Sequence, residues 1–188
     1  MSEICMIMAI GPEGVIGKGD KLAWHSKQDF NHFVKKTTGW PCIFGATTFY
    51  GLPKYPLKNR LCIVVNIEAK DTELKQNENG IWIETNTIEK ALEITKAYDK
   101  VFICGGKSIY AYFLNNNLID TIYLTKINSK DGSLENDITE HPSDFVKFPI
   151  DLDAYTKDWY HIEIIYSHTP HPENYKCTFI KFTKQKPE

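Results

Sequence analysis

The chain has 188 residues, and its 22 lysine and arginine side chains nearly balance its 24 aspartate and glutamate side chains, for a net charge of -2. This balance gives no electrostatic reason to expect nucleic acid or a membrane surface as a partner. The hydrophobic share of 42% and the aromatic share of 13% exclude a disordered chain. At this length we predict one globular domain that covers residues 1–188.

The cysteines and histidines show neither a disulfide framework nor a metal site. The five cysteines are an odd number without a C-x-x-C pair, and each lies in or beside an apolar run, so we expect buried thiols in a reducing compartment. His168 and His171 stand close together, but Pro170 and Pro172 place them in a loop, and we predict no metal site. No segment is long and apolar enough to span a membrane, and no basic leader precedes the first apolar run, so we expect a cytoplasmic protein.

The N-terminal segment predicts a strand, a glycine-containing loop and a helix. Residues 4–10 are continuously apolar, which is typical of a strand buried on both faces. Ser26 has the position of an N-cap, and Gly39 is the expected left-handed cap at the other end of the helix. The loop glycines are Gly14, Gly17 and Gly19, and the apolar positions of the helix are Phe30, Phe33 and Val34.

Strands and helices then alternate along the chain. Short apolar runs predict strands at residues 42–44, 60–65, 81–83, 101–104 and 121–125. Helical patterns cover residues 88–97, with Asn86 and Glu89 as a start signal, and residues 108–114. The charged residues 68–79 are expected on the surface.

The last third of the chain has a different pattern. Residues 128–156 are polar and rich in aspartate, serine and proline, and they predict a long loop with little regular structure. Residues 160–166 and 175–182 alternate well, and the turn residues 168–174 between them predict an antiparallel hairpin. We therefore predict an α/β fold, in which helices flank one mostly parallel sheet with an antiparallel C-terminal edge.

Three predicted strands end in turns that carry glycine and lead toward helices: after Ala9, at Gly45 and at Gly105-Gly106. Ligands of open α/β sheets bind beyond the carboxyl ends of the strands, and helix N-termini suit a pyrophosphate. Each turn by itself is also explained as an ordinary connection between a strand and a helix. Neither G-x-G-x-x-G nor G-x-x-x-x-G-K-[ST] occurs, so the standard dinucleotide and NTPase motifs are absent from the sequence.

Asp29 is the acid whose role the sequence leaves open at this point. It lies three residues after Ser26, and an S-x-x-D pattern is most often a capping box. Asp29 and Phe33 are four residues apart and therefore share one side of the helix. A carboxylate on the side that faces the core is unusual for a solvated residue. We favour the interpretation that Ser26 caps the helix and Asp29 turns into a pocket.

Several segments, in the order and spacing found here, resemble dihydrofolate reductases from one end of the chain to the other. They are the apolar first strand, Val15-Ile16-Gly17, Leu22-Ala23-Trp24 with an acid five residues later, Ile43-Phe44-Gly45-Ala46-Thr47-Thr48-Phe49, Asn59-Arg60, Ile103-Cys104-Gly105-Gly106-Lys107-Ser108-Ile109-Tyr110, Ile122-Tyr123-Leu124-Thr125 and Asn136-Asp137. The resemblance implies a monomer with an eight-stranded, mostly parallel sheet and about four helices.

The resemblance also implies an activity: NADPH-dependent reduction of 7,8-dihydrofolate to tetrahydrofolate, with hydride transfer to C6 and protonation of N5. This reaction supports one-carbon metabolism and thymidylate synthesis. Asp29 would be the only acid in the pterin pocket, where Thr125 hydrogen-bonds it and Trp24 holds a water. Leu22 would gate the water that protonates N5, and Tyr110 would lie beside the nicotinamide.

The remaining implied roles are binding roles. Substrate would contact the backbone carbonyls of Ile7 and Cys104 at the pterin edge, together with Met8, Asp29 and Thr125. Phe33 and Leu52 would sandwich the benzoyl ring, and Arg60 would pair with the glutamate α-carboxylate, which suits a bidentate guanidinium. The cofactor would contact Ala9, Ile16, Gly17, Gly45, Ala46, Thr47, Thr48, Asn66, Cys104, Gly105, Gly106, Lys107, Ser108, Ile109 and Tyr110.

This sequence departs from the family pattern at several positions. Ala23 replaces a proline, so the stiffness of the loop before the helix differs. Ala46 and Ser108 stand where arginines of other members hold the adenosine 2′-phosphate, and the candidates to replace them are Thr47, Asn66, Lys107 and Lys70. Asn136 replaces a frequent glycine, whereas Asp137 keeps the acid that can accept amide hydrogen bonds from the first loop, so we expect that loop to be gated.

Two other functions fit parts of the pattern. One is a pyrimidine or pteridine reductase of the riboflavin route, although such enzymes lack the acid and tryptophan at the mouth of the helix. The other is a folate or dinucleotide binding protein without turnover, which the missing phosphate arginines suggest.

Overall fold

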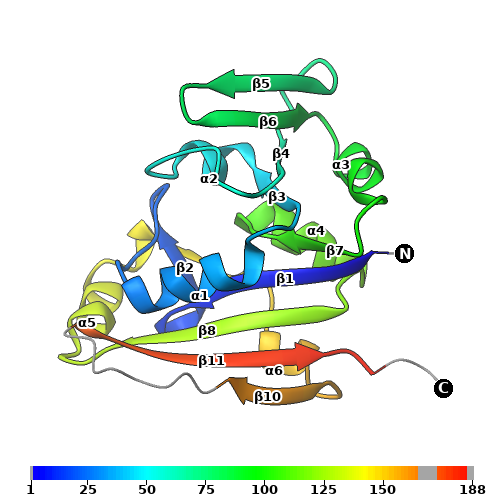
Figure 1. The fold of residues 1–188 in the computed structure, drawn as a ribbon. Coiled ribbons are helices and arrows are strands. Elements are labelled where there is room, and N and C mark those ends of the chain that lie inside the picture. Colours follow the sequence, from blue (N-terminus) through cyan, green and yellow to red (C-terminus); the bar gives the residue numbers. More distant parts are fainter. Residues whose placement is uncertain (1, 165–172, 186–188) are drawn as a thin grey trace.

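A computed structural model describes residues 2–164 and 173–185, and it confirms the α/β fold with a mixed sheet (Figure 1). Within these residues the main sheet has nine strands. They are β1 (Glu3–Ile10), β3 (Cys42–Gly45), β4 (Cys62–Val65), β5 (Glu73–Asn77), β6 (Gly80–Thr85), β7 (Lys100–Ile103), β8 (Thr121–Ser129), β10 (Tyr160–Ile164) and β11 (Tyr175–Thr183). Their spatial order is β10-β11-β8-β1-β7-β3-β4-β6-β5.

The strands from β8 to β6 in this order run parallel, and both edges of the sheet are antiparallel. At one edge β11 pairs with β8 and β10 pairs with β11, as the alternating C-terminal segments predicted. At the other edge β5 pairs with β6. The predicted number of eight strands was therefore too low, because the exposed strand β5 lies in a charged segment without apolar alternation. Most of the predicted turn at residues 168–174, with His168 and His171, lies outside the described residues.

Six α-helices are present in the described part of the chain, rather than about four. They are α1 (Lys27–Thr37), α2 (Ala46–Tyr50), α3 (Ile88–Thr95), α4 (Lys107–Asn115), α5 (Ser133–Glu140) and α6 (Leu152–Tyr155). Side chains from α3, α4 and α6 share one buried cluster with Met6 and Met8 of β1. Side chains from α1 and α2 pack with Cys5 and Ile7 of the same strand. Because neighbouring residues of a strand point to opposite faces, the helices cover both faces of the sheet.

The prediction of a long irregular loop at residues 128–156 was wrong. This segment contains α5, the short 3-10 helix η2 (Pro142–Asp144), the strand β9 (Phe145–Lys147) and α6. Its few apolar residues have helical spacing and are buried, as for Leu134 and Ile138. The side chain of Asp151 accepts a hydrogen bond from the backbone N–H of Ala154 and thereby caps α6. The polar composition concealed a small number of well-placed core residues.

The first glycine-containing loop is more ordered than the sequence predicted. It contains the 3-10 helix η1 (Pro12–Gly14) and the strand β2 (Val15–Lys18), which pairs antiparallel with β9 in a separate two-stranded sheet. Gly17 is required here, since a Cβ atom would lie 2.8 Å from the backbone oxygen of Lys21. At the start of α3 the cap is Thr87, which accepts from the N–H of Lys90, and not Asn86 as predicted.

Candidate functional site

Asp29 lies in the first turn of α1, and its carboxylate is not used as a cap. The cap is Ser26, whose Oγ accepts a hydrogen bond of 3.2 Å from the Asp29 backbone N–H. The Asp29 side chain instead hydrogen-bonds the hydroxyl of Thr125 in β8, a residue that is 1% exposed. Burial raises the pKa of the Asp29 carboxyl above its ordinary value, although the neighbouring Thr125 and Trp24 side chains act in the opposite direction.

A second acid, Glu173, completes the start of α1. Its carboxylate accepts hydrogen bonds from the Ser26 hydroxyl at 2.9 Å and from the Lys27 backbone N–H at 2.8 Å. A carboxylate at a helix N-terminus is favourable because the free amides and the helix dipole are positive there. Glu173 therefore provides the anion that a capping box would take from Asp29. Sequence reasoning missed this residue, and no local pattern connects it to a helix that lies 147 residues earlier.

We expect Ser26→Ala to lower the free energy of unfolding by about 1 kcal/mol, because the Asp29 N–H loses its acceptor and Glu173 loses a donor. Thr87→Ala is a matched control, since it removes the equivalent cap bond from α3. Both variants should be destabilised in chemical denaturation, and only Ser26→Ala should lower kcat/KM by shifting Asp29. Equal activity of the two variants would contradict a positioning role for Ser26.

The loop before α1 lies against the same pocket. Trp24 is 5% exposed and packs so closely on Gly11 that a Cβ atom there would be 3.0 Å from the indole ring. The indole Nε1 lies near the Asp29 carboxyl and lowers its pKa, but no group in the described part of the chain meets it with hydrogen-bond geometry, which leaves this buried donor for a water or ligand. Leu22 is 60% exposed, so its side chain stays available for contact with a ligand.

Three candidates for the substrate tail come together beside α1. The Arg60 guanidinium lies 5.7 Å from the centre of the Phe33 ring, and its Nη2 donates to the Thr38 hydroxyl at 3.1 Å. Leu52 and Phe33 pack against the same buried cluster, the one that contains Ile7 and Cys104. The arrangement places one cation next to an apolar slot, as a ligand with an aromatic ring and a terminal carboxylate requires.

The two glycine turns predicted at Gly45 and Gly105-Gly106 touch each other. The Gly45 N–H donates to the Gly105 oxygen at 2.7 Å, and the Gly105-Gly106 peptide is cis. A Cβ atom on Gly106 would lie 2.6 Å from the Thr48 hydroxyl oxygen, and one on Gly45 would lie 3.2 Å from Ile109. Helices α2 and α4 begin directly after these turns, so their free backbone N–H groups face the same place.

The nicotinamide candidates lie at the carboxyl end of β1. The Tyr110 hydroxyl donates to the Ile7 carbonyl at 2.9 Å, and burial raises the pKa of this phenol well above its ordinary value, so it remains a donor. Ala9 is the direct neighbour of Thr125 in the pairing of β1 with β8. Cys104 is a buried thiol whose pKa burial raises well above its ordinary value, so it is not a nucleophile.

The remaining candidates differ in how they are placed. The Met8 side chain packs with Leu124 in the cluster on the other face of the sheet, so any contact with substrate is through its backbone. Lys107 and Ser108 are exposed on the first turn of α4. Thr47 is exposed on α2, and Asn66 follows β4, farther along the sheet.

The structure changes the partner expected for Asp137 but not the loop that it contacts. Its carboxylate forms an ion pair with the Lys18 ammonium at 2.6 Å and contacts the His141 ring at 3.2 Å, and no hydrogen bond from a backbone amide of the first loop reaches it within the described residues. Asp137 thus holds the loop through the Lys18 side chain. Backbone pairing braces the rest of the loop: β2 pairs with β9, the Gly19 N–H donates to the Asp144 oxygen at 3.0 Å, and the Phe148 N–H donates to the Gly14 oxygen at 2.7 Å. Glu13 adds an ion pair with Lys147 at 2.9 Å.

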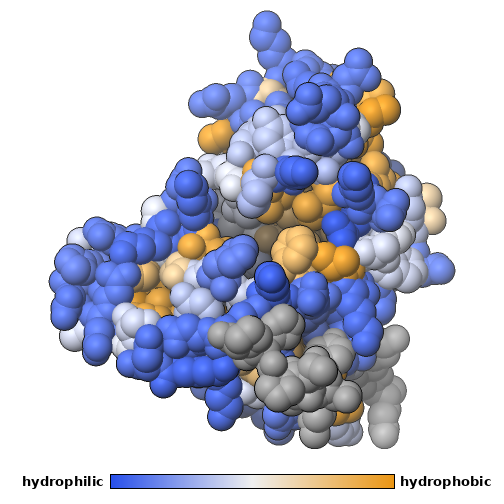
Figure 2. Space-filling model, turned by 60° about the vertical axis from the view of Figure 1, so that its left-hand side comes forward, coloured by the Kyte–Doolittle hydropathy of each residue, from blue (hydrophilic) through white to orange (hydrophobic). Residues whose placement is uncertain are grey.

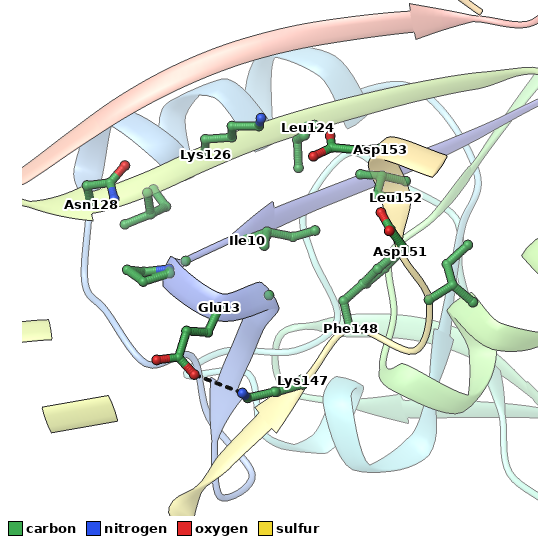
Figure 3. Close-up of a pocket in the computed structure, with 15 residues that line it drawn as sticks. Ile10, Glu13, Leu124, Lys126, Asn128, Lys147, Phe148, Asp151, Leu152 and Asp153 are labelled. Carbon is green, nitrogen blue, oxygen red and sulfur yellow. Dashed lines mark hydrogen bonds and ion pairs between the residues drawn. The ribbon is translucent and has the colours of Figure 1, made fainter. Parts of the chain in front are cut away.

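A cavity of about 480 Å³ lies elsewhere, behind η1 and beside α6 (Figure 3). None of its lining residues is a site candidate from the sequence. Ile10 and Leu124 line it, whereas their chain neighbours Ala9 and Thr125 point to the other face of the sheet, where Asp29 lies. The candidate site therefore lies on the other face of the sheet from this cavity. Figure 2 shows a hollow with hydrophobic surface in the middle of the molecule.

Two kinds of feature are absent from residues 2–164 and 173–185. No group of three or more histidine, cysteine, aspartate or glutamate side chains is placed to hold a metal ion. No helix there is long and apolar enough to cross a membrane.

Comparison with known proteins identifies relatives along the chain. The family model described as dihydrofolate reductase matches residues 3–184. Dihydrofolate reductase of Haemophilus influenzae is 27% identical over 180 residues, which are 96% of this chain and 98% of that protein. Dihydrofolate reductase type 9 of Escherichia coli is 32% identical over 134 residues, covering 68% and 71%. The structure of the Enterococcus faecalis dihydrofolate reductase complexed with NADP(H) and RAB-propyl superposes with a TM-score of 0.69 at 22% identity, over 98% of this chain and 97% of that one.

Proposed function

The chain belongs to the dihydrofolate reductase family, and we propose that it reduces 7,8-dihydrofolate to tetrahydrofolate with NADPH as the hydride donor. The observation that carries this proposal is the Asp29 carboxylate, held by Thr125 at the mouth of α1 beside the glycine turns. We further propose that residues 1–188 form one domain, that the protein acts as a cytoplasmic monomer, and that its product serves one-carbon metabolism and thymidylate synthesis.

The residues at the glycine turns fit the nicotinamide and pyrophosphate parts of a nicotinamide dinucleotide. A Cβ atom at Gly45, Gly105 or Gly106 would meet neighbouring atoms, so only glycine lets the two turns come this close together. The Gly45 N–H is bonded to the Gly105 oxygen, and the donors for a phosphate are the free N-terminal amides of α2 and α4. Ala9, Ile16, Gly17 and Tyr110 would form the nicotinamide end. When bound, NADPH supplies the hydride that C6 of the substrate accepts.

The protein contributes orientation, a proton and exclusion of water. In this proposal Asp29 accepts hydrogen bonds from the amide and 2-amino edge of the pterin, and Thr125 fixes the carboxylate. Burial keeps the Asp29 proton to a higher pH than an exposed carboxyl would. A water near Trp24, shielded by Leu22, passes the proton to N5.

One assay tests the function directly. The purified protein, NADPH and dihydrofolate are mixed, and the loss of nicotinamide absorbance is followed. We expect turnover that depends on both substrates. Tight binding of both ligands without turnover at any pH would show instead a binding protein of this family.

Arg60→Gln tests the substrate tail. We expect the KM for dihydrofolate to rise about 10- to 100-fold with little change in kcat, because a charge-assisted bond to the glutamate carboxylate is lost. A dihydropterin without the glutamate should show no change. Lys58→Gln is the matched control, since Lys58 is an exposed cation two residues away. A similar rise for the dihydropterin would contradict contact with the tail.

A further inference from the structure

Glu84 is a buried carboxylate that the proposed reaction does not use. It lies near the end of β6 and is 6% exposed. The Tyr50 hydroxyl donates to one carboxylate oxygen, and the Asn66 amide donates to the other at 3.2 Å. Burial and the bond to Glu84 raise the pKa of Tyr50 to about 12, so the phenol stays a donor. None of the ion pairs in the described residues includes Glu84.

A dinucleotide that starts at the carboxyl end of β1 and extends along the strand order would bring its adenosine toward Glu84. The cofactor candidates begin at the carboxyl end of β1, and the strand order then passes through β7, β3 and β4 to β6 (Figure 1). Val64 of β4 is the direct neighbour of Glu84, and the Asn66 N–H donates to the Thr85 oxygen at 2.8 Å. Tyr50 connects Glu84 to α2, and Ala46 is one helical turn earlier on the same side of that helix.

This end of the site has lysines but no arginine. Arg60 is the only arginine in the sequence, and it lies against Phe33 at the substrate end. Lys90 is paired with Asp71 at 2.6 Å, and Lys75 is paired with Glu73 at 2.5 Å.

The neighbours that remain are short polar groups and two exposed lysines. The Thr72 and Thr85 hydroxyls lie 3.2 Å apart and are uncharged. Lys70 and Lys107 are exposed cations on separate segments, one after β4 and one on α4. No guanidinium fork is therefore available for a phosphate at this place.

A carboxylate and a missing arginine affect the two nicotinamide cofactors differently. The ribose of NADH carries a 2′-hydroxyl, which can donate a hydrogen bond to a carboxylate. NADPH carries a 2′-phosphate at the same atom, and this dianion is repelled by a nearby carboxylate and needs cations for binding. The residues at this end thus fit the hydroxyl better than the phosphate.

We propose that Glu84 relaxes cofactor selectivity, so that NADH serves as a hydride donor alongside NADPH with less than about a tenfold difference in kcat/KM. The part of this inference that concerns kcat/KM rests on the proposed function. The part that concerns nucleotide binding does not, because binding at the adenosine end can be measured without dihydrofolate.

The test compares 2′,5′-ADP with 5′-AMP, which differ only in the 2′-phosphate. Calorimetry on the full chain should give dissociation constants within about tenfold of each other. Glu84→Gln keeps the shape but removes the charge: its amide oxygen can accept from Asn66 and its NH₂ can donate to the Tyr50 hydroxyl. It should improve 2′,5′-ADP binding about tenfold relative to 5′-AMP. Ala46→Arg should shift the ratio in the same direction by adding a cation. Glu78→Gln, an exposed acid on the β5–β6 turn, is the matched control and should leave the ratio unchanged.

Two results would overturn the proposal. One is wild-type binding of 2′,5′-ADP that is more than about tenfold tighter than binding of 5′-AMP, which would show that Lys70 or Lys107 binds the 2′-phosphate. The other is an unchanged ratio in Glu84→Gln. The same variants are then assayed with NADH and NADPH, and an inactive protein that still shows the predicted nucleotide ratios would refute the proposed reaction but not the role of Glu84.

Discussion

Asp29→Asn is expected to lower kcat/KM for dihydrofolate by about 10²- to 10⁴-fold at neutral pH, because the variant can neither bind the pterin edge as an anion nor hold the proton for N5. Asp158→Asn is the matched control, since Asp158 is exposed and far along the chain from the site, and it should keep wild-type activity. Stopped-flow or steady-state loss of nicotinamide absorbance measures the effect. A wild-type rate in Asp29→Asn would show that Asp29 has neither role.

The same variant should be at least as stable as the wild type at neutral pH. The pKa of Asp29 is raised by burial in the folded chain. The contribution of the Asp29 carboxyl to stability is therefore fully present below the pKa that this group has in the unfolded chain. It is lost as the pH rises through the pKa that the group has in the folded chain. At neutral pH the buried charge is unfavourable, and asparagine removes it. Chemical denaturation at acidic and neutral pH checks the sign, and a clear loss of stability at neutral pH would contradict it.

The rate of the reaction should depend on pH through the protonation of Asp29. If the protonated Asp29 carboxyl feeds the water that protonates N5, the rate of hydride transfer falls as the pH rises through its raised pKa. Asp29→Asn should lose this dependence. A pH profile that is unchanged in the variant would assign the titration to another group.

Gly105→Ala is expected to have the second large effect. Gly105 has φ of +100°, and a Cβ atom would lie 3.0 Å from the Tyr110 ring. The strain and the clash should lower the free energy of unfolding by about 1–3 kcal/mol. The KM for NADPH should rise by about tenfold or more, because the turn and Tyr110 both shift. Thermal unfolding and steady-state kinetics measure the two effects.

Gly132→Ala separates backbone strain from the clash. Gly132 also has a positive φ, +76°, but no atom lies within 4 Å of a Cβ atom built there. It should lose stability through strain alone and keep the wild-type KM for NADPH. If both variants had the same KM, the contact between Gly105 and Tyr110 would not matter for the cofactor.

Local patterns in the sequence predicted the elements of the fold that depend on neighbours in the chain. The apolar runs gave the positions of β1, β3 and β7, and Ser26 caps α1 as its spacing indicated. Gly39 has the expected positive φ, +87°. The pattern failed where the apolar signal was sparse, as in α5 and β9, or where an exposed strand has no apolar face, as in β5.

The sequence alone determined that this is an α/β chain with glycine turns at three strand ends and an acid at the mouth of the first helix. Only the tertiary structure decided what surrounds that acid. Glu173 supplies the anion at the start of α1 beside the Ser26 cap, Thr125 holds the Asp29 carboxylate, and pairing with β9 braces the first loop together with the ion pair between Asp137 and Lys18. The tertiary structure likewise placed Glu84, whose carboxylate accepts hydrogen bonds from Tyr50 and Asn66. The reason is physical: caps, turns and strand runs depend on residues a few positions apart, whereas burial and partner choice depend on segments that meet only after the sheet has formed.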